Sequence, residues 1–205
     1  MSLTLLSKHL KFKKLFNSLA KQVHKDNVKR KIIHKGLTKE SVLVGIAYHF
    51  IIETFNVDKH IDFTPLRKIP IIENIEELYL NLLGKRDKDS LIQKSVILAV
   101  IEVFKKSGKT TFLRFYDNDR IIEDLNNLFH SIELVIKDFD ETSHVHFRYD
   151  GVPIELDYID NDKIIDFKTS MNGYISKNML IQQFIYKIVS EYFDDIEYTN
   201  YIYFA

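Results

Sequence analysis

The spacing of apolar residues predicts helices over most of the first 140 residues. Between residues 5 and 23, leucines and other apolar residues recur at helical spacing with lysines between them, which indicates an amphipathic helix or helix pair. The segment SVLVGIAYHFIIETF (41–55) is apolar nearly all round, so we expect a core helix, with Thr38 or Ser41 as its cap. Similar patterns predict helices in ENIEELYLNLLG (73–84), DSLIQKSVILAVIEVFKK (89–106) and RIIEDLNNLFHSIELVIKDF (120–139).

After about Glu141 the pattern becomes typical of strands. HVHFRY (144–149) and VPIELDYI (152–159) are separated by Asp150-Gly151, a two-residue hairpin signal, and a second turn leads into KIIDFKTS (163–170). A helix over about 177–192 and a last strand in 197–205 follow. We therefore expect an α/β fold: a central mixed sheet with an antiparallel meander, flanked by helices, and a largely helical N-terminal or inserted region.

Composition narrows the classes of site that the chain can hold. It contains no cysteine, which excludes disulfides, thiolate zinc sites and cysteine-ligated iron–sulfur clusters, so a metal must be held by histidine, carboxylate or carbonyl groups. No apolar run approaches the roughly 18 residues that cross a bilayer, and residues 1–16 lack the order of a secretory signal. A cytoplasmic (intracellular) location without membrane contact is the expectation.

Charge is distributed unevenly along a chain of zero net charge. Residues 1–40 hold eleven Lys or Arg and two carboxylates, whereas from Asp138 onward thirteen carboxylates face five cations. A basic end and an acidic end suit a protein that binds a polyanion and concentrates divalent cations. Lysines that merely solvate helix faces remain the alternative.

Carboxylates and one lysine share strand faces in the predicted meander. In KIIDFKTS, Asp166 and Lys168 project to one side, and in the strand before it Glu155 and Asp157 share a face. The tight turn between the strands brings Asp157 near Asp166. Such a set can hold a hard cation beside an amine, although an outward-facing, salt-bridged strand pair is also compatible with the pattern.

These residues resemble the PD-(D/E)xK nuclease superfamily, which has a carboxylate in a hairpin followed by Asp-x-Lys in the next strand, here Asp166-Phe167-Lys168. The sequence IIDFKTS (164–170) resembles the hydrophobic–Asp–aromatic–Lys–Thr segment of the RecB-like branch of this superfamily. Two further matches support this: Gln182 to Tyr186 reproduces the Gln-x-x-x-Tyr helix motif, and Gly45 to His49 resembles the Gly-x-x-x-His helix.

The resemblance implies a restriction-endonuclease-like fold and a metal-dependent DNA nuclease. It implies Asp157, Asp166 and Lys168 as catalytic residues, and His49, Asp157, Asp166 and the backbone carbonyl of Phe167 as ligands of Mg²⁺ or Mn²⁺, with Glu155 as a further candidate. Gln182 and Tyr186 would position the lysine or the DNA strand. The iron–sulfur cluster of the CRISPR-associated RecB-like exonucleases is excluded here, because its four cysteines are missing.

The expected function is endo- or exonucleolytic cutting of DNA, with single strands preferred. A catalytically inactive nucleic-acid-binding or assembly protein is the alternative. We expect one nuclease domain over residues 1–205, with a basic helical segment at 1–40 and a helical insertion at about 60–140. A homo-oligomer is compatible with a small nuclease that lacks its own helicase.

One motif is set aside. Ser107-Gly108-Lys109-Thr110 ends like a P-loop, but Val103 stands where the first glycine is required. A helix is predicted before it, and the strand-like TTFLRFY (110–116) follows, which is the reverse of the P-loop order. We therefore expect no nucleotide cofactor.

Overall fold

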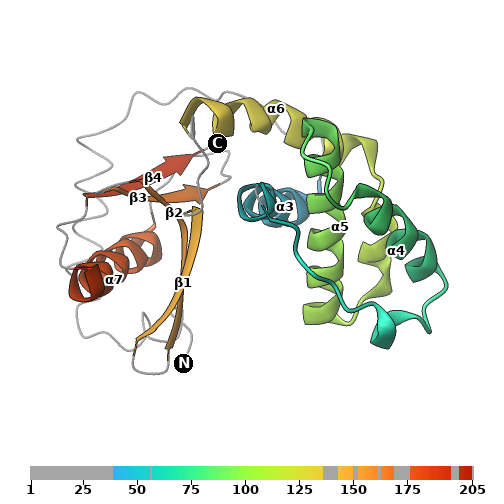
Figure 1. Ribbon diagram of the computed structural model, residues 1–205, viewed down its shortest axis with the longest axis horizontal. Coiled ribbons are helices and arrows are strands. Elements are labelled where there is room, and N and C mark those ends of the chain that lie inside the picture. The colour runs from blue at the N-terminus through green and yellow to red at the C-terminus, as the bar shows by residue number, and fades with distance from the viewer. Residues whose placement is uncertain are drawn as a thin grey trace. The chain divides into compact units, whose positions relative to one another are not determined.

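A computed structural model describes residues 39–55, 57–135, 143–149, 152–160, 163–168, 176–194 and 199–204 (Figure 1). The chain divides into two compact units. The helical unit is continuous and comprises residues 34–141, and the sheet unit combines residues 1–33 with residues 142–205. The predicted basic helical segment at 1–40 lies outside the described residues apart from Lys39 and Glu40.

The helical unit contains four described α-helices and two short 3₁₀ helices. Helix α3 packs on α5 and α6, and α5 also contacts α4 and the second 3₁₀ helix. Fully buried apolar side chains, among them Tyr48, Ile51, Ile97 and Leu125, fill the space between the helices. The elements are α3 (Ser41–Thr54), η1 (Thr64–Leu66), α4 (Ile71–Leu82), α5 (Lys88–Ser107), η2 (Thr110–Phe115) and α6 (Asp119–Val135).

Helix α5 is bounded by residues that satisfy its terminal backbone groups. The Asp87 carboxylate accepts a hydrogen bond from the Ser90 N–H at 2.9 Å, which is a side-chain N-cap. At the other end Gly108 has φ 70°, a left-handed conformation that glycine adopts without a Cβ penalty, and its N–H donates to Phe104 O at 2.8 Å. The helix therefore begins and ends where local chemistry dictates.

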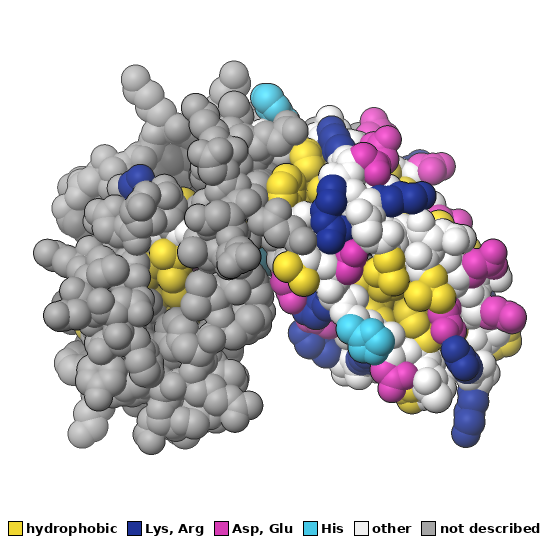
Figure 2. Space-filling model, viewed as in Figure 1, with side chains coloured by type: hydrophobic (Ala, Val, Ile, Leu, Met, Phe, Trp, Pro, Cys, Tyr) yellow, Lys and Arg dark blue, Asp and Glu magenta, His cyan; other side chains and the backbone are white. Residues whose placement is uncertain are grey.

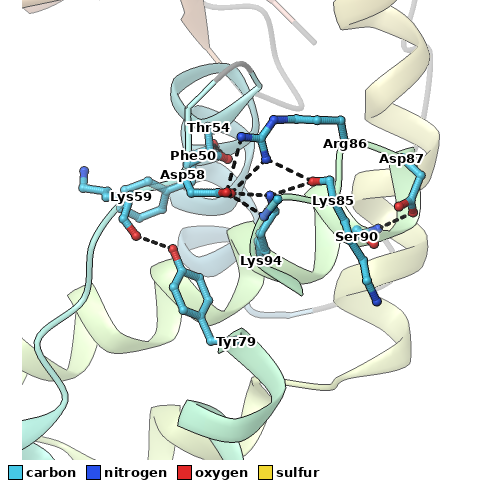
Figure 3. Close-up of polar contacts among 11 residues, drawn as sticks. Phe50, Thr54, Asp58, Lys59, Tyr79, Lys85, Arg86, Asp87, Ser90 and Lys94 are labelled. Atoms are coloured by element: carbon cyan, nitrogen blue, oxygen red, sulfur yellow. Dashed lines mark hydrogen bonds and ion pairs between the residues drawn. The ribbon is translucent and has the colours of Figure 1, made fainter. Parts of the chain in front are cut away.

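A charged cluster joins the segment after α3 to the loop between α4 and α5 (Figure 3). The Asp58 carboxylate accepts hydrogen bonds from Lys94 Nζ at 2.6 Å, from Arg86 Nη1 at 2.9 Å and from the Gly84 N–H at 2.7 Å. Lys94 Nζ also donates to Lys85 O at 2.9 Å. These donors lower the pKa of Asp58 to about 2 although partial burial opposes the shift. We refer to these residues as the Asp58 cluster.

On the face of the helical unit shown in Figure 2, acidic and basic side chains are interspersed around areas of apolar side chains. The ion pair of Arg67 with Glu76, at 2.7 Å, is one example of opposite charges paired on the surface of this unit. Exposed pairs of this kind contribute little to stability.

The sheet unit contains four described strands in the order β1-β2-β3-β4. The first three pair antiparallel and β4 lies parallel to β3. The helix α7 (Lys177–Asp194) contacts β3 and β4. The strands are β1 (Ser143–Tyr149), β2 (Val152–Asp160), β3 (Lys163–Lys168) and β4 (Thr199–Phe204).

The expectation of an α/β fold arranged around a central mixed sheet is wrong for the described part of the chain. Helix predominates there, and residues 57–135 contain no strand at all. Strand side chains are described only in short stretches of β2 and β3. The physical reason is that α3 and α5 bury their apolar faces against each other, so the helical unit closes its own core without a sheet.

Two local expectations are also corrected. Glu40 stands at the N-cap position of α3 and makes no side-chain cap hydrogen bond, while Ser41 is already the first helical residue. The segment 110–116 is not a strand: Thr110–Phe115 forms the 3₁₀ helix η2, because Leu113 is fully buried where η2 packs on α5. The prediction of one nuclease domain over the whole chain stays a prediction.

None of the described helices has the length and apolar character that a membrane crossing requires.

Candidate active site

The register of β2 and β3 brings two predicted aspartates together. Tyr158 pairs with Ile165 and Ile159 with Ile164, so one further step in this antiparallel register sets Asp157 opposite Asp166. Directly opposed residues project to the same face with Cβ atoms about 4.5–5.5 Å apart. Both carboxylates are buried, Asp166 at 1% and Asp157 at 8% exposure. They lie close enough for the charge of Asp157 to raise the pKa of Asp166.

Lys168 supplies the positive charge beside this pair. Its Nζ donates to Asp166 Oδ1 at 2.6 Å, and its side chain is 20% exposed, so the ammonium group reaches from a half-buried position to a fully buried carboxylate. The other oxygen of Asp166, Oδ2, is buried and has no hydrogen-bond partner among the described residues. A buried acceptor left without a donor is costly, which marks this atom as a position where a ligand would be stabilising.

Burial first, and then the neighbouring charge of Asp157, raise the pKa of Asp166 to about 6, although the Lys168 ammonium opposes both effects. A carboxyl group in this state holds a proton more readily than an exposed aspartate. When both carboxylates are ionised, their negative charge exceeds the positive charge of Lys168, whose ammonium is paired with Asp166.

The donor set fits a hard divalent cation. Two carboxylates, one with a buried oxygen that has no donor, offer oxygen ligands of the kind that Mg²⁺ and Mn²⁺ accept. Among the described residues no group of three or more His, Asp or Glu side chains is placed to hold a metal ion. Magnesium is commonly held by one or two carboxylates and keeps several waters, so two carboxylates meet its requirement.

Helix α7 carries the Gln182 and Tyr186 of the predicted helix motif. Gln182 Nε2 donates to the Tyr186 hydroxyl, as expected for residues four apart on one helix face. Tyr186 is buried and Gln182 is half-buried. Because α7 contacts β3, the helix that carries this pair lies against the strand that carries Asp166 and Lys168.

The other predicted ligands are placed as follows. Glu155 lies in β2 opposite His146, and Phe167 lies in β3 opposite Tyr203, each by its backbone pairing. His49 lies in α3 of the helical unit, where its half-buried ring meets the Tyr48 ring edge-on with centroids 6.5 Å apart. The structure thus brings Asp157, Asp166 and Lys168 together in the sheet unit, while His49 belongs to the helical unit.

Comparisons with known proteins assign no family to this arrangement. No protein-family model matches the chain, and neither the curated proteins nor the solved structures yield a match. The nuclease resemblance therefore rests on the residues quoted above.

The Asp58 cluster was not predicted from the sequence. Its one signal is that Lys94 lies within the largely apolar segment from Leu91 to Val103, where a lysine side chain must be buried or leave the helix face. The partner Asp58 stands 36 residues earlier in the chain, and no local pattern points to it.

Proposed function

We propose that this chain is a metal-dependent nuclease that hydrolyses phosphodiester bonds in DNA, with Asp157, Asp166 and Lys168 as its catalytic residues. The observation that carries the proposal is the buried carboxylate pair with Lys168 Nζ at 2.6 Å from Asp166 Oδ1, next to an Asp166 oxygen that has no donor. Membership of the RecB-like branch is part of the proposal and is supported by the order of the four motifs. An intracellular location is also part of it, because the substrate is found there.

The residues of the site would have two roles, metal binding and stabilisation of the charge on the phosphate. Asp157 and Asp166 would hold Mg²⁺ or Mn²⁺, which when bound supplies Lewis-acid polarisation of the phosphate and a water of lowered pKa. Lys168 is fixed by its hydrogen bond to Asp166, so its ammonium is oriented in advance to offset charge that develops on the phosphate. His49, Glu155 and the Phe167 carbonyl stay predicted ligands.

Gln182 and Tyr186 are proposed as positioning residues. Their mutual hydrogen bond holds both polar groups in one orientation on the helix that contacts β3. A pair fixed in this way can orient Lys168 or a DNA strand without rearrangement when the substrate binds.

The test is cleavage of end-labelled single-stranded DNA, duplex DNA and single-stranded RNA in Mg²⁺, in Mn²⁺ and in EDTA. We expect metal-dependent cutting of DNA, and a loss of about a hundredfold or more in rate for Asp166→Asn and for Lys168→Met, as for removal of a preorganised charge from other active sites. Lys163→Met, which removes another half-buried lysine of β3, is the matched control and should cut at the normal rate.

Cutting that persists in EDTA, or that is unchanged in Asp166→Asn and Lys168→Met, would contradict the proposal. DNA binding without hydrolysis in any metal would instead identify a nucleic-acid-binding protein with an inactive site. Efficient cutting of RNA alone would replace the DNA substrate in the proposal with RNA.

A further inference from the structure

The segment from Lys105 to Tyr116 comprises the end of α5, the residues that follow it and η2, and leads to the start of α6. We refer to it as the basic turn. It contains the Ser107-Gly108-Lys109-Thr110 sequence, which does not form a P-loop, since a helix precedes it and a 3₁₀ helix follows it. Its hydroxyl and charged side chains at positions 105–111 are exposed to solvent.

The basic turn carries a local excess of positive charge. Lys105, Lys106, Lys109 and Arg114 are all exposed, and there is no carboxylate between Glu102 and Asp117. Lys106 pairs with Glu102, and the charge of Lys105 acts on the Asp62 carboxylate, whereas Lys109 and Arg114 take part in no ion pair with any described residue.

The negative end of the α5 helix dipole explains the positions of only some of these cations. Cations in the last turn of a helix are stabilised by its carbonyl groups, which explains Lys105 and Lys106 at the end of α5. Lys109 and Arg114 lie beyond Gly108, which ends the helix, and the helix effect falls off within its last turn. The fold gives these two side chains no partner among the described residues, so their charge is directed to solvent.

Aromatic rings are interleaved with the cations on a backbone that is held in place. Phe115 and Tyr116 are each half-buried and so present part of their rings to solvent. Between Arg114 and the helix end, Leu113 is fully buried and anchors η2 to α5. Gln93 Nε2, from the second turn of α5, donates to Tyr116 O at 2.5 Å and fixes the end of the segment.

From this combination we infer that the basic turn is a binding surface for single-stranded DNA. The cations match the spaced phosphates of a flexible polyanion, and the partly exposed rings offer stacking platforms to unpaired bases, which a duplex keeps stacked internally. The choice of DNA as the polymer rests on the proposed nuclease function.

The test is equilibrium binding of a fluorescent single-stranded oligonucleotide to the full chain in EDTA, where no cleavage occurs, over a range of salt concentrations. The variant Lys105→Gln/Lys109→Gln/Arg114→Gln should bind about tenfold or more weakly, and its slope of log affinity against log salt should be shallower by about 2, for three lost phosphate contacts. Tyr116→Leu should lose about fivefold or more through lost stacking.

The matched control removes three exposed lysines elsewhere on the helical unit, Lys39→Gln/Lys68→Gln/Lys85→Gln, and so changes the net charge equally. It should retain the affinity within about threefold and the wild-type salt slope. Far-ultraviolet circular dichroism and thermal melting verify that both triple variants are folded.

Wild-type affinity in the basic-turn variant, or an equal loss in the control, would overturn the inference. Tighter binding of duplex DNA, or of anionic phosphatidylserine vesicles, than of the single strand would overturn it as well. Failure of the two proposals can be told apart. Salt-sensitive binding through the basic turn without cleavage in any metal leaves this surface standing and rejects the nuclease. Metal-dependent cutting with an unchanged KM in the basic-turn variant supports the nuclease and rejects this surface as its DNA-binding site.

Discussion

At the scale of single residues, Asp166 is the most constrained group in the candidate site. It is nearly inaccessible to solvent, faces another carboxylate, and is paired on one oxygen only. Its pKa of about 6 lies above the value of 3.8 for an unperturbed aspartate. Between these two pH values the folded state therefore binds more protons than the unfolded state.

This difference predicts how stability depends on pH in EDTA. The free energy of unfolding should fall as the pH rises from about 4 to about 6, because folding must then retain an ionised, buried carboxylate. Asp166→Asn removes that cost, so we expect the variant to be more stable than the wild type at pH 8, by roughly 2 kcal/mol, and no more stable at pH 4. Urea unfolding at both pH values measures the effect.

Asp89→Asn, at an exposed position in the first turn of α5, controls for the loss of one negative charge. It should show no comparable gain at pH 8. If Asp166→Asn is instead less stable than the wild type at pH 8, the carboxylate is ionised and held by Lys168, and the raised pKa is wrong.

At the scale of elements, the Asp58 cluster holds together two connecting segments of the helical unit. Asp58 lies after α3, and its partners Gly84 and Arg86 lie between α4 and α5, while Lys94 comes from within α5. Only 1% of the Lys94 side chain is exposed, so its ammonium depends on Asp58 and on Lys85 O for its partners. The cluster is therefore asymmetric: the lysine is the more deeply buried partner.

This asymmetry predicts unequal effects of removing the two partners. Asp58→Ala should lower the free energy of unfolding by about 2–4 kcal/mol, because it leaves the Lys94 charge buried without a carboxylate. Lys94→Met should cost less, since Asp58 keeps Arg86 and the Gly84 N–H and is partly exposed to water. Glu76→Gln, which breaks the exposed Arg67 pair, is the control and should have little effect. Equal losses for Asp58→Ala and Glu76→Gln would show that the cluster is not stabilising.

At the scale of the whole molecule, the division into two units matters most. The helical unit is one continuous stretch of chain, and the contacts of α3, α4, α5 and α6 described here lie within it. Buried side chains from all four helices form its core. A segment that closes its own hydrophobic core meets the main requirement for folding alone.

We therefore predict that residues 34–141 expressed alone form a helical, cooperatively folded fragment. Thermal unfolding followed by circular dichroism should show a single sigmoidal transition. The fragment with Asp58→Ala should melt at a lower temperature than the unaltered fragment, as in the full chain. A gradual, non-cooperative loss of helix would show that the unit requires the rest of the chain.

The sequence by itself determined the positions of the elements to within a few residues. The helices α3, α5 and α7 and the strands β2 and β3 lie where the apolar spacing predicted them, because helix and strand periodicity are local properties of the chain. It also determined that Asp157 and Asp166 come together. A strand, a short turn and a second strand allow few other registers, and the structure adds the contact of Lys168 with Asp166.

Only the tertiary structure decided how these elements are grouped. The apolar faces of α3 and α5 do not encode which surface they cover, and in the folded chain they cover each other. The segment 110–116 has strand-like residues but forms a 3₁₀ helix, because the burial of Leu113 against α5 outweighs its local preference. Likewise Lys94 is tolerated inside the helical unit because Asp58, distant in sequence, is brought within 2.6 Å of it. Packing and burial depend on residues that are far apart along the chain, and this is why they required the folded molecule.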